Sequence, residues 1–570
     1  MDTLQELVQS LEKKPGVALS WKDGQLSYAE LYGKITAFSK GLHVLGLEPG
    51  DTIAVFSKNL PEWILVSLGI NNAGMVDVPR GEDNSPEDLA YIIEHSESKL
   101  VIVDDESTLK KVTGKIGQDK IYSIKPIAGA KNIADIIAEG MNTEIPLPSV
   151  SPDQTASIIY TSGTTGNPKG VELTHRNFAS NMDAVLARLA ITSEDKNMSI
   201  LPAWHTFERI AKYVFLAIGS ESYYTTQRSL MKDLQTQKPT VMASVPRIWE
   251  SVYSMILKNI REKSPEGSFM DKLFTRAVAY GNHKTPLNWA AYQLCNIFIF
   301  SKVRKQLGGN FRFAVSGGSG LPQHIDDFYR AAEIKILEGY GMTETSPVLS
   351  VRSFYADEKH SVGKPLENLD IKISEDGVLF VKGPSIMKGY FKNPEATKEV
   401  LSTDGWLCTG DLAHMNDQGC LVITGRAKDL IKLSNGEYVN PAGIELALKN
   451  SPYIDAVVVV GQDAKHLGAL IVPNLDLLEL YCKNQGIAFS RNPTAFKEYV
   501  LPHKTIKALF TAEIKKYNAT AGFKNYEIIN DYLLLPTPFT VGKELTASLK
   551  VKRRAVEQVY QREIQALLGK

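Results

Sequence analysis

The sequence predicts an α/β protein with a large N-terminal domain of layered, mostly parallel sheets and a small α+β C-terminal domain. Short strand-like runs alternate with helical patterns over most of the chain, which is typical of parallel sheets covered by helices. Three such pairs, in chain order, are 52–57 with 62–74, 89–98 with 99–105, and 311–318 with 322–332. A chain of 570 residues is also too long for one hydrophobic core, so two or more domains are expected.

The pattern changes near Gly425. Residues 419–445 indicate a pair of strands and then a helix that starts at Pro441, and residues 456–474 indicate two further strands. Helical segments rich in Lys and Tyr follow. We therefore assign residues 1–425 to the N-terminal domain, 426–429 to a connecting hinge and 430–570 to the C-terminal domain.

Composition narrows the class of protein. The chain has 64 Lys and Arg residues against 64 Asp and Glu residues, so it lacks the basic excess that a nucleic-acid partner usually requires. Its four cysteines have no metal-ligand spacing and are expected to be reduced thiols of a cytoplasmic protein. They are Cys295, Cys408, Cys420 and Cys482.

No segment resembles a secretory signal or a spanning helix. Residues 1–16 alternate acidic, apolar and basic side chains, and no run of about 18 apolar residues occurs. The most apolar segment, Leu287–Val303, is interrupted by Asn288, Gln293 and Asn296. Two interpretations stay open for it: a buried helix under a substrate pocket, or a surface that rests on the inner face of a bilayer. The oligomeric state also stays open, with a homodimer among the alternatives.

Residues Tyr160–Asn177, "YTSGTTGNPKGVELTHRN", form a glycine- and hydroxyl-rich segment. Glycines let the backbone curl so that several N–H groups point inward, and such a nest suits an anion. Lys169 adds a positive charge that suits phosphate oxygens. The segment is not the P-loop of nucleotide hydrolases, because that pattern places Ser or Thr after the lysine and here Gly170 follows.

This segment resembles the phosphate loop of the adenylate-forming, AMP-binding superfamily, which includes acyl-CoA synthetases, luciferases and the adenylation domains of peptide synthetases. Further motifs follow in the order of that family: "LPAWHTFERI", "VPRIWE", "VSGGSGLP", "GYGMTETSP", "GWLCTGDL" and "GRAKDLIKLSNGEYVNP". The resemblance covers nearly the whole chain. The motifs "LPAWHTFER", "VPRIWE", "VDVPRGEDNS" and "TASLKVKRR" are similar to the branch of long-chain fatty acid–CoA ligases and acyl-ACP synthetases.

The resemblance implies a reaction in two halves. A carboxylate attacks the α-phosphate of ATP to give an acyl-adenylate and pyrophosphate, and a thiol then displaces AMP. Two anions at about 4 Å repel by roughly 4 kcal/mol at an effective dielectric near 20, so the first half needs cations near the α-phosphate. ATP, Mg²⁺ and coenzyme A as the thiol substrate are the implied small molecules.

The resemblance also implies the site residues, each carried over from a matching motif. The ATP phosphates would be bound by Thr161, Ser162, Gly163, Thr164, Thr165, Gly166 and Lys169. The AMP moiety would be bound by Gly317, Gly318, Gly339, Tyr340, Gly341, Met342, Asp411 and Arg426. The catalytic set would be Lys550, Glu344, His205 and Thr343, with Thr161 and Glu344 as metal ligands, Lys428 as the hinge of a mobile C-terminal domain, and Gly436 in the thiol channel.

Several of these assignments carry alternatives. Lys543 in "TVGKEL" also matches a simpler family spacing, but alignment on "LTASLKVKR" favours Lys550. Asn435 and Tyr438 depart from residues common in relatives, as do Ala547 and Ser548, which leaves the local turn and the thiol channel open.

The segment that follows "LPA", residues 204–215, indicates the class of substrate. The resemblance places His205 near the reacting carboxylate, with orientation as its role, whereas Glu208 and Arg209 are expected to form an internal ion pair. "WHTFERIAKYVF" contains no Asp to anchor a substrate amine, so a fatty acid is favoured over an amino acid.

The thiol acceptor has two candidates. Coenzyme A is preferred, and acyl carrier protein is the alternative, for which a basic patch would suit docking. That patch comprises Lys504, Lys507, Lys515, Lys516 and Lys524. A non-catalytic lipid- or nucleotide-binding relative is a third interpretation, which the intact set of charged residues disfavours.

Overall fold

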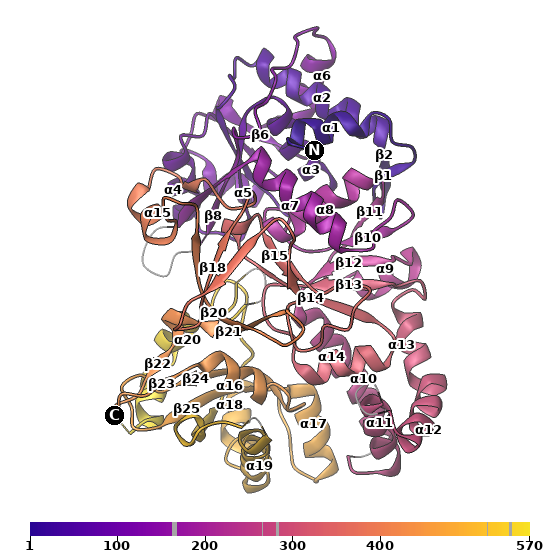
Figure 1. Cartoon of the computed structure of the whole chain (residues 1–570), viewed down its shortest axis with the longest axis vertical. Helices are drawn as coiled ribbons and strands as arrows, with labels where there is room; N and C mark the ends of the chain where they lie inside the picture. The colour runs from indigo at the N-terminus through magenta and orange to yellow at the C-terminus, as the bar shows by residue number, and fades with distance from the viewer. Residues whose placement is uncertain (162–167, 265, 281–283, 521, 547–549, 570) are drawn as a thin grey trace.

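Two large sheets dominate the N-terminal part of the chain. A computed structural model describes residues 1–570 except 162–167, 265, 281–283, 521, 547–549 and 570 (Figure 1). In the described residues one sheet has nine strands, parallel in its centre and antiparallel at both edges. Its order is β16 (Lys364–Pro365), β15 (Val348–Val351), β14 (Lys335–Gly341), β13 (Phe313–Ser316), β12 (Val241–Ser244), β10 (Lys196–Ser199), β11 (Glu221–Tyr224), β1 (Val17–Trp21) and β2 (Gly24–Ser27).

The second sheet contains the two arms of the glycine-rich segment. Among the described residues it has eight strands, and all pairs are parallel except those that β9 makes with β8 and β19. Its order is β19 (Gly389–Tyr390), β9 (Lys169–Thr174), β8 (Thr155–Thr161), β4 (Val76–Arg80), β3 (Thr52–Phe56), β5 (Leu100–Val103), β6 (Ile121–Ser123) and β7 (Lys131–Asn132).

A common core joins the two sheets. Buried side chains of a helical layer pack with those of both sheets, and Trp63, Phe178 and Tyr213 are among the largest of them. The layer consists of α1 (Leu4–Leu11), α2 (Tyr28–Val44), α3 (Pro61–Asn72), α7 (His175–Arg188) and α8 (Thr206–Ile218). Other helices of this part are α4 (Pro86–Ser96), α5 (Glu106–Val112), α6 (Ile133–Met141), α9 (Leu230–Gln237) and α15 (Pro394–Val400).

A smaller antiparallel sheet leads to the C-terminal part. Its order is β17 (Asp370–Ile373), β18 (Val378–Lys382), β20 (Leu407–Met415) and β21 (Leu421–Arg426). A short 3₁₀ turn at Ala427–Asp429 follows. The C-terminal part then contains β22 (Ile431–Lys432), β23 (Tyr438–Val439), α16 (Pro441–Leu448), β24 (Ile454–Val460), β25 (Leu467–Pro473), α17 (Leu475–Asn484), α19 (Lys504–Thr520), β26 (Ile529–Leu534), α20 (Arg553–Val559) and α21 (Gln561–Leu567).

Charged and polar contacts hold the C-terminal part against α10 (Pro246–Lys263). Arg247 donates two hydrogen bonds to Asp455, at 2.6 and 2.8 Å, and Lys449 Nζ lies 2.6 Å from Glu250 Oε1. A bidentate arginine–carboxylate pair fixes orientation as well as distance. These contacts therefore set one orientation of the C-terminal part relative to the N-terminal part.

The apolar segment 287–303 is helical but lies at the surface. It spans α12 (Pro286–Cys295), a π-helical turn (Asn296–Phe300) and the start of α13 (Ser301–Gln306), and it packs beside α11 (Phe269–Ala279) at the end of the molecule farthest from the N-terminus (Figure 1). The buried-helix interpretation is wrong for its outer face, where Ile297 is 64% exposed and Phe298 60%. Hydrophobic periodicity is the same whether such a face meets a protein core or a lipid surface. No helix in the described part of the chain has the length and apolar character needed to cross a bilayer.

Candidate active site

The glycine-rich segment is the connection of an antiparallel hairpin. Strand β8 ends at Thr161 and β9 begins at Lys169, and these two residues are partners across the hairpin. The Thr161 hydroxyl is 3.5 Å from the Lys169 carbonyl oxygen. The predicted phosphate-binding residues Ser162, Gly163, Thr164, Thr165 and Gly166 lie outside the described residues.

Tyr390 connects the predicted phosphate lysine with the predicted metal ligand. Its hydroxyl donates to Glu344 Oε1 at 2.9 Å, and Lys169 Nζ lies 5.0 Å from the centre of its ring. Sequence reasoning missed Tyr390. Tyr390 reaches the site because β19 pairs with β9, which places Tyr390 opposite Val171. This strand pairing could not be predicted from the sequence.

Glu344 has the character of a cation ligand. It lies in the 3₁₀ turn Thr343–Thr345, which packs beside β9, and it is buried. Burial raises the pKa of its carboxyl group, while the Tyr390 hydrogen bond and Arg426 lower it. Glu344 forms no ion pair with any described residue, and no described group of three His, Cys, Asp or Glu side chains is arranged around a metal. A carboxylate with a neighbouring hydroxyl suits Mg²⁺, which keeps several waters and takes few protein ligands.

Asp411 and its two donors form the second part of the site. Asp411 Oδ2 accepts a hydrogen bond from the Tyr340 hydroxyl, and Asp411 Oδ1 accepts one from Arg426 Nε at 2.8 Å. Strands β20 and β21 pair Asp411 directly with Arg426, which explains why residues 15 apart meet. Burial raises the pKa of Tyr340 strongly, and Asp411 adds to that shift, so the phenol stays protonated and keeps donating.

The glycines on either side of Tyr340 leave little room for a side chain. A Cβ on Gly341 would lie 1.9 Å from the Pro347 carbonyl oxygen, and a Cβ on Gly339 would lie 3.3 Å from that of Ser350. The backbone N–H of Met342 donates to the same Pro347 oxygen at 3.2 Å. Thr343 follows, half-buried, at the start of the 3₁₀ turn.

Lys550, from the C-terminal part of the chain, lies beside Gly318 of the N-terminal part. A Cβ on Gly318 would lie 3.3 Å from Lys550 Cε and 3.9 Å from Lys550 Nζ. The Lys550 residue is exposed as a whole, yet the protein around its ammonium group lowers its pKa by burial, and Arg426 lowers the pKa further, whereas Asp411 raises it. Lys550 is therefore the group through which the two parts of the chain share one site.

His205 lies near two cationic side chains, Lys550 and Arg80. It caps the N-terminus of α8, where its Nδ1 accepts from the Phe207 backbone N–H at 3.3 Å. Burial lowers the His205 pKa to about 4, and Lys550 and Arg80 lower it as well. A neutral imidazole whose Nδ1 accepts carries its proton on Nε2, so His205 can donate one hydrogen bond. The Phe207 ring lies 3.3 Å from where a Cβ on Gly317 would be.

Arg80 and Trp204 are further neighbours that sequence reasoning missed. The Arg80 guanidinium lies 5.0 Å from the centre of the Trp204 ring and donates to the Tyr160 carbonyl oxygen at 2.7 Å. It thereby links the end of β4 to the strand that enters the glycine-rich segment. Arg80 lies in "VDVPRGEDNS", a motif that suggested only the family branch.

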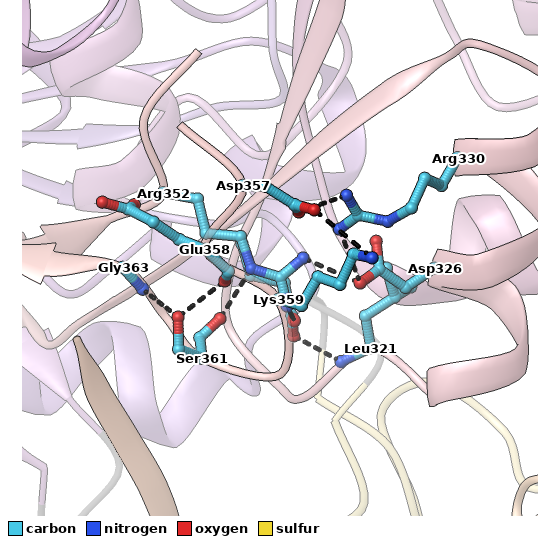
Figure 2. A network of polar contacts seen from close by, with 10 residues as sticks. Leu321, Asp326, Arg330, Arg352, Asp357, Glu358, Lys359, Ser361 and Gly363 are labelled. Carbon is cyan, nitrogen blue, oxygen red and sulfur yellow. Dashed lines mark hydrogen bonds and ion pairs between the residues drawn. The ribbon is translucent and has the colours of Figure 1, made fainter. Parts of the chain in front are cut away.

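A buried network fastens the strand that carries Tyr340 to the loop that follows Gly318. Glu338 Oε1 accepts from the Leu321 backbone N–H at 2.8 Å, and Glu338 Oε2 binds Arg352. Arg352 also donates to Asp326 Oδ2 at 2.9 Å and to the Ser361 carbonyl oxygen at 2.7 Å (Figure 2). One arginine therefore fixes three chain segments around the predicted AMP-binding residues.

The expected Glu208–Arg209 ion pair is wrong. Arg209 instead lies 2.8 Å from Asp77, with both side chains fully buried, and Glu208 accepts hydrogen bonds from Ser199 and from the Leu201 backbone N–H. Adjacent residues of a helix point in different directions, so each meets a different layer of the core.

The predicted hinge residue lies near Asp411 and Arg426, and the predicted thiol-channel residue lies in a hairpin of the C-terminal part. Lys428 is exposed within the 3₁₀ turn Ala427–Asp429. Gly436 occupies the tight turn between β22 and β23 at φ +89°, with open space around it. That hairpin bonds to its own domain, where Ser434 N–H donates to the Ala464 carbonyl oxygen.

The site therefore brings together cationic groups from both parts of the chain and two carboxylates. Lys169, Arg426 and Lys550 supply positive charge, and Asp411 and Glu344 supply carboxylates. Such a set can bind a polyanion and stabilise charge that develops on it. The sequence profile described as AMP-binding enzyme matches residues 8–391, and that of the AMP-binding enzyme C-terminal domain matches residues 428–570.

The chain belongs to the AMP-binding enzyme family.

Curated relatives of this AMP-binding enzyme are similar over most of their length. A long-chain-fatty-acid–[acyl-carrier-protein] ligase of Arabidopsis thaliana is 32% identical over 95% of this chain and 82% of its own. A long-chain-fatty-acid–CoA ligase of Mycobacterium tuberculosis is 31% identical over 96% of this chain and 93% of its own. A probable acyl-activating enzyme of Arabidopsis thaliana is 31% identical over 95% and 84%.

Solved structures confirm the predicted α/β fold of this AMP-binding enzyme. The adenylation domain of a carboxylate reductase from Mycobacterium chelonae has a TM-score of 0.76 at 21% identity, covering 100% of this chain and 91% of that one. ATP-bound MatB from Rhodopseudomonas palustris has a TM-score of 0.74 at 21% identity, covering 99% of both chains.

Proposed function

We propose that this enzyme activates a long-chain fatty acid with ATP, releasing pyrophosphate, and then transfers the acyl group from the acyl-adenylate to coenzyme A. The observation that supports this most is the position of Lys550 against Gly318, among His205, Arg426 and Asp411. A cation at that point suits the half-reaction in which two anions must approach.

In the first half-reaction a carboxylate oxygen of the fatty acid attacks the α-phosphorus of ATP. The new bond joins that oxygen to phosphorus, and the bond to the bridging oxygen breaks as pyrophosphate leaves. Lys550 offsets the repulsion between the two anions and the charge that builds up on the phosphorus centre. Lys169 performs the same task toward the outgoing phosphates.

Mg²⁺ would be held by Glu344 and the Thr161 hydroxyl, where it would neutralise phosphate oxygens. Within the protein, Tyr390 keeps the Glu344 carboxylate oriented through its hydrogen bond. His205, neutral and with a proton on Nε2, would orient the fatty acid carboxylate by donating to it.

The adenosine end would be held by Tyr340, Asp411 and Arg426. The Tyr340 ring would stack on adenine, and Asp411, held by its two donors, still has lone pairs for the ribose hydroxyls. Thr343 would contact the α-phosphate. Gly339 and Gly341 keep this edge free of side chains.

In the second half-reaction the acceptor thiol loses its proton to solvent, its sulfur attacks the acyl carbonyl, the bond between the carbonyl carbon and the phosphate oxygen breaks, and AMP leaves. We propose that the C-terminal domain rotates about Lys428 between the two halves, so that the turn containing Gly436 replaces Lys550 at the site. The exposure of Lys428 and the open space around Gly436 are compatible with that exchange.

A fatty acid fits the segment after His205 better than an amino acid does. The acidic residue of that segment, Glu208, is occupied by Ser199 and Leu201, so no carboxylate is left to hold a substrate amine. The names of the curated relatives agree with this chemistry. A series of saturated fatty acids tests the assignment, because each buried methylene is worth about 0.8 kcal/mol and chain length should change KM steeply.

Acyl carrier protein is a second candidate acceptor. The acyl-carrier-protein ligase of Arabidopsis thaliana is as similar to this chain as the CoA ligase is, and α19 exposes Lys504, Lys507 and Lys515 at spacings that share one helix face. The deciding experiment offers coenzyme A and holo carrier protein side by side. If K507E/K515E lowers transfer to the carrier and spares transfer to coenzyme A, the carrier is an acceptor.

The reaction itself is tested by pyrophosphate release. With ATP, Mg²⁺ and palmitate the wild-type enzyme should release pyrophosphate, and hydroxylamine should trap the acyl-adenylate. Absence of release with every fatty acid in the series would contradict the proposal and favour a binding protein without catalysis.

A further inference from the structure

Helices α11 and α12 and the π-helical turn after α12 expose a surface of large apolar side chains that no other described part of the chain covers. We call this surface the apolar ridge. Five of its side chains are more than half exposed, on two helices that pack together and the turn that follows them, and monomeric soluble proteins rarely expose large apolar patches. The ridge comprises Phe269 (77% exposed), Met270 (39%), Leu287 (58%), Trp289 (52%), Leu294 (47%), Ile297 (64%) and Phe298 (60%).

The ridge stands on a packed aromatic base. On the inner side of the same helices Tyr292 stacks on Tyr280 at 4.9 Å between ring centres, and Phe300 lies 6.0 Å from Phe328 of α14 (Gln323–Ala331). Cys295 and Phe300 are almost completely buried. The outward side chains are therefore held in place by a firm core, and their exposure belongs to the folded state.

The segment that carries the ridge is mostly positively charged. Residues 269–306 contain six Lys and Arg residues and one acidic residue, in a chain whose net charge is zero. The acidic residue, Asp271, turns toward Arg261 and the Gly267 backbone N–H. The exposed basic residues, none of which forms an ion pair with a described residue, are Lys272, Arg276, Lys284, Lys302 and Lys305.

We propose that the apolar ridge docks on an anionic lipid bilayer, with α11, α12 and the π-helical turn lying in the plane of the interface. Large apolar side chains beside unpaired lysines match the composition of an interfacial helix, and the exposed carboxylates next to them, Glu266 and Glu333, are paired with Arg261 and Arg304. Trp289 suits the headgroup level, where an indole ring keeps one apolar and one wet side. Each basic side chain near a surface of anionic lipids strengthens binding about fivefold.

Other occupants fit less well. A second copy of the chain paired through the same surface would bring the two basic rims together, and like charges at an interface oppose binding. An acidic carrier protein would match the rim but would leave the apolar side chains without a matching partner. The proposal is independent of the proposed enzymatic function, because it rests on surface composition alone.

Two measurements on the full-length protein test the proposal. In vesicle flotation, wild-type protein should float with vesicles of phosphatidylglycerol and phosphatidylcholine and should float much less with phosphatidylcholine alone. The fluorescence of Trp289 should shift to shorter wavelength on binding, and W289F should lose that shift while still floating. High salt should weaken binding, because the exposed lysines contribute through screened charge.

Variants separate the outcomes. I297N/F298N and K302E/K305E should each lower vesicle affinity by about tenfold or more, whereas the matched controls Y355N and K22E, at exposed sites elsewhere, should bind as wild type does. Thermal melting checks that each variant is folded. Equal flotation of I297N/F298N and wild type, or no flotation of either, would overturn the proposal. So would a wild-type dimer that I297N/F298N converts to monomer without any vesicle binding.

Discussion

Lys550 lies against Gly318, although the two residues are 232 positions apart and belong to different parts of the chain. The glycine leaves the space that the lysine occupies. Its backbone has φ +92°, a conformation that other residues adopt only with strain. In this arrangement of the molecule the C-terminal lysine lies beside the predicted AMP-binding glycine.

Gly318→Ala is expected to impair pyrophosphate release more than it impairs stability. A Cβ 3.3 Å from Lys550 Cε would push the lysine away, and the positive φ would cost about 1–2 kcal/mol. Gly320→Ala is the matched control, because its Cβ would meet only Leu446 at 3.6 Å. Pyrophosphate assays and urea unfolding of both variants check this, and equal activity of G318A and G320A would contradict it.

Arg352→Met is expected to lower the free energy of unfolding by about 3–5 kcal/mol, because it leaves Glu338 and Asp326 buried without their partner. The loop after Gly318 should also become less ordered, because Glu338 holds it through the Leu321 backbone N–H. Under conditions in which R352M is still folded, its KM for ATP should therefore be higher than that of the wild type. Arg352→Lys keeps one charge but cannot make all three contacts, so intermediate values are expected. Urea unfolding and ATP titrations measure both effects, and wild-type values for R352M would show that the network does not position the site.

His175 makes the fold sensitive to acid. Its Nδ1 accepts from the Leu4 backbone N–H at 3.3 Å, and burial lowers its pKa to about 3, with Arg209 lowering it further. Below pH 6.5 the unfolded chain takes up a proton here that the folded chain does not, so stability is lost as pH falls from 6.5 toward 3. The slope should be about 1.4 kcal/mol per pH unit for this histidine.

His175→Asn provides the comparison, because an amide oxygen can accept the same hydrogen bond without taking up a proton. Urea unfolding between pH 7.5 and 5 should show a shallower loss of stability in H175N than in the wild type. Identical slopes in the two proteins would contradict the prediction, because they would show that protonation of His175 does not contribute to the loss of stability at low pH.

Lys428→Pro is expected to separate the two half-reactions. A fixed φ at the exposed 3₁₀ turn should hinder rotation of the C-terminal domain while leaving the observed orientation intact. Pyrophosphate release should therefore stay near the wild-type rate, and thioester formation should become slow. A proportionate loss of both rates in single-turnover experiments would argue against domain rotation.

The segments that form the candidate site could be identified from the sequence because each is a short contiguous motif. The residues around Lys169, Gly318, Tyr340, Asp411 and Lys550 could all be found by their neighbours in the chain. The contact of Lys550 with Gly318 could be anticipated only through the family resemblance, since nothing local to either motif refers to the other.

The partners of these residues could not be read in the same way. Tyr390 reaches Glu344 through strand pairing, and Arg209 finds Asp77 rather than Glu208 because a three-dimensional core selects the partner. The exposure of Ile297 and Phe298 could not be predicted from the sequence either. An apolar helix face shows the same sequence pattern whether it packs against protein or faces outward. Which side chains are buried, and which partners they contact, depends on how the sheets and helices pack in three dimensions.

The most direct test of the account is pyrophosphate release by Lys550→Ala, measured beside thioester formation from supplied palmitoyl-adenylate and coenzyme A. Loss of the cation should slow adenylate formation by about 100-fold to 1,000-fold, while the reaction of the supplied adenylate should proceed at the wild-type rate. Lys543→Ala, which removes the other candidate lysine, should leave both rates unchanged. Normal pyrophosphate release by K550A would contradict the account.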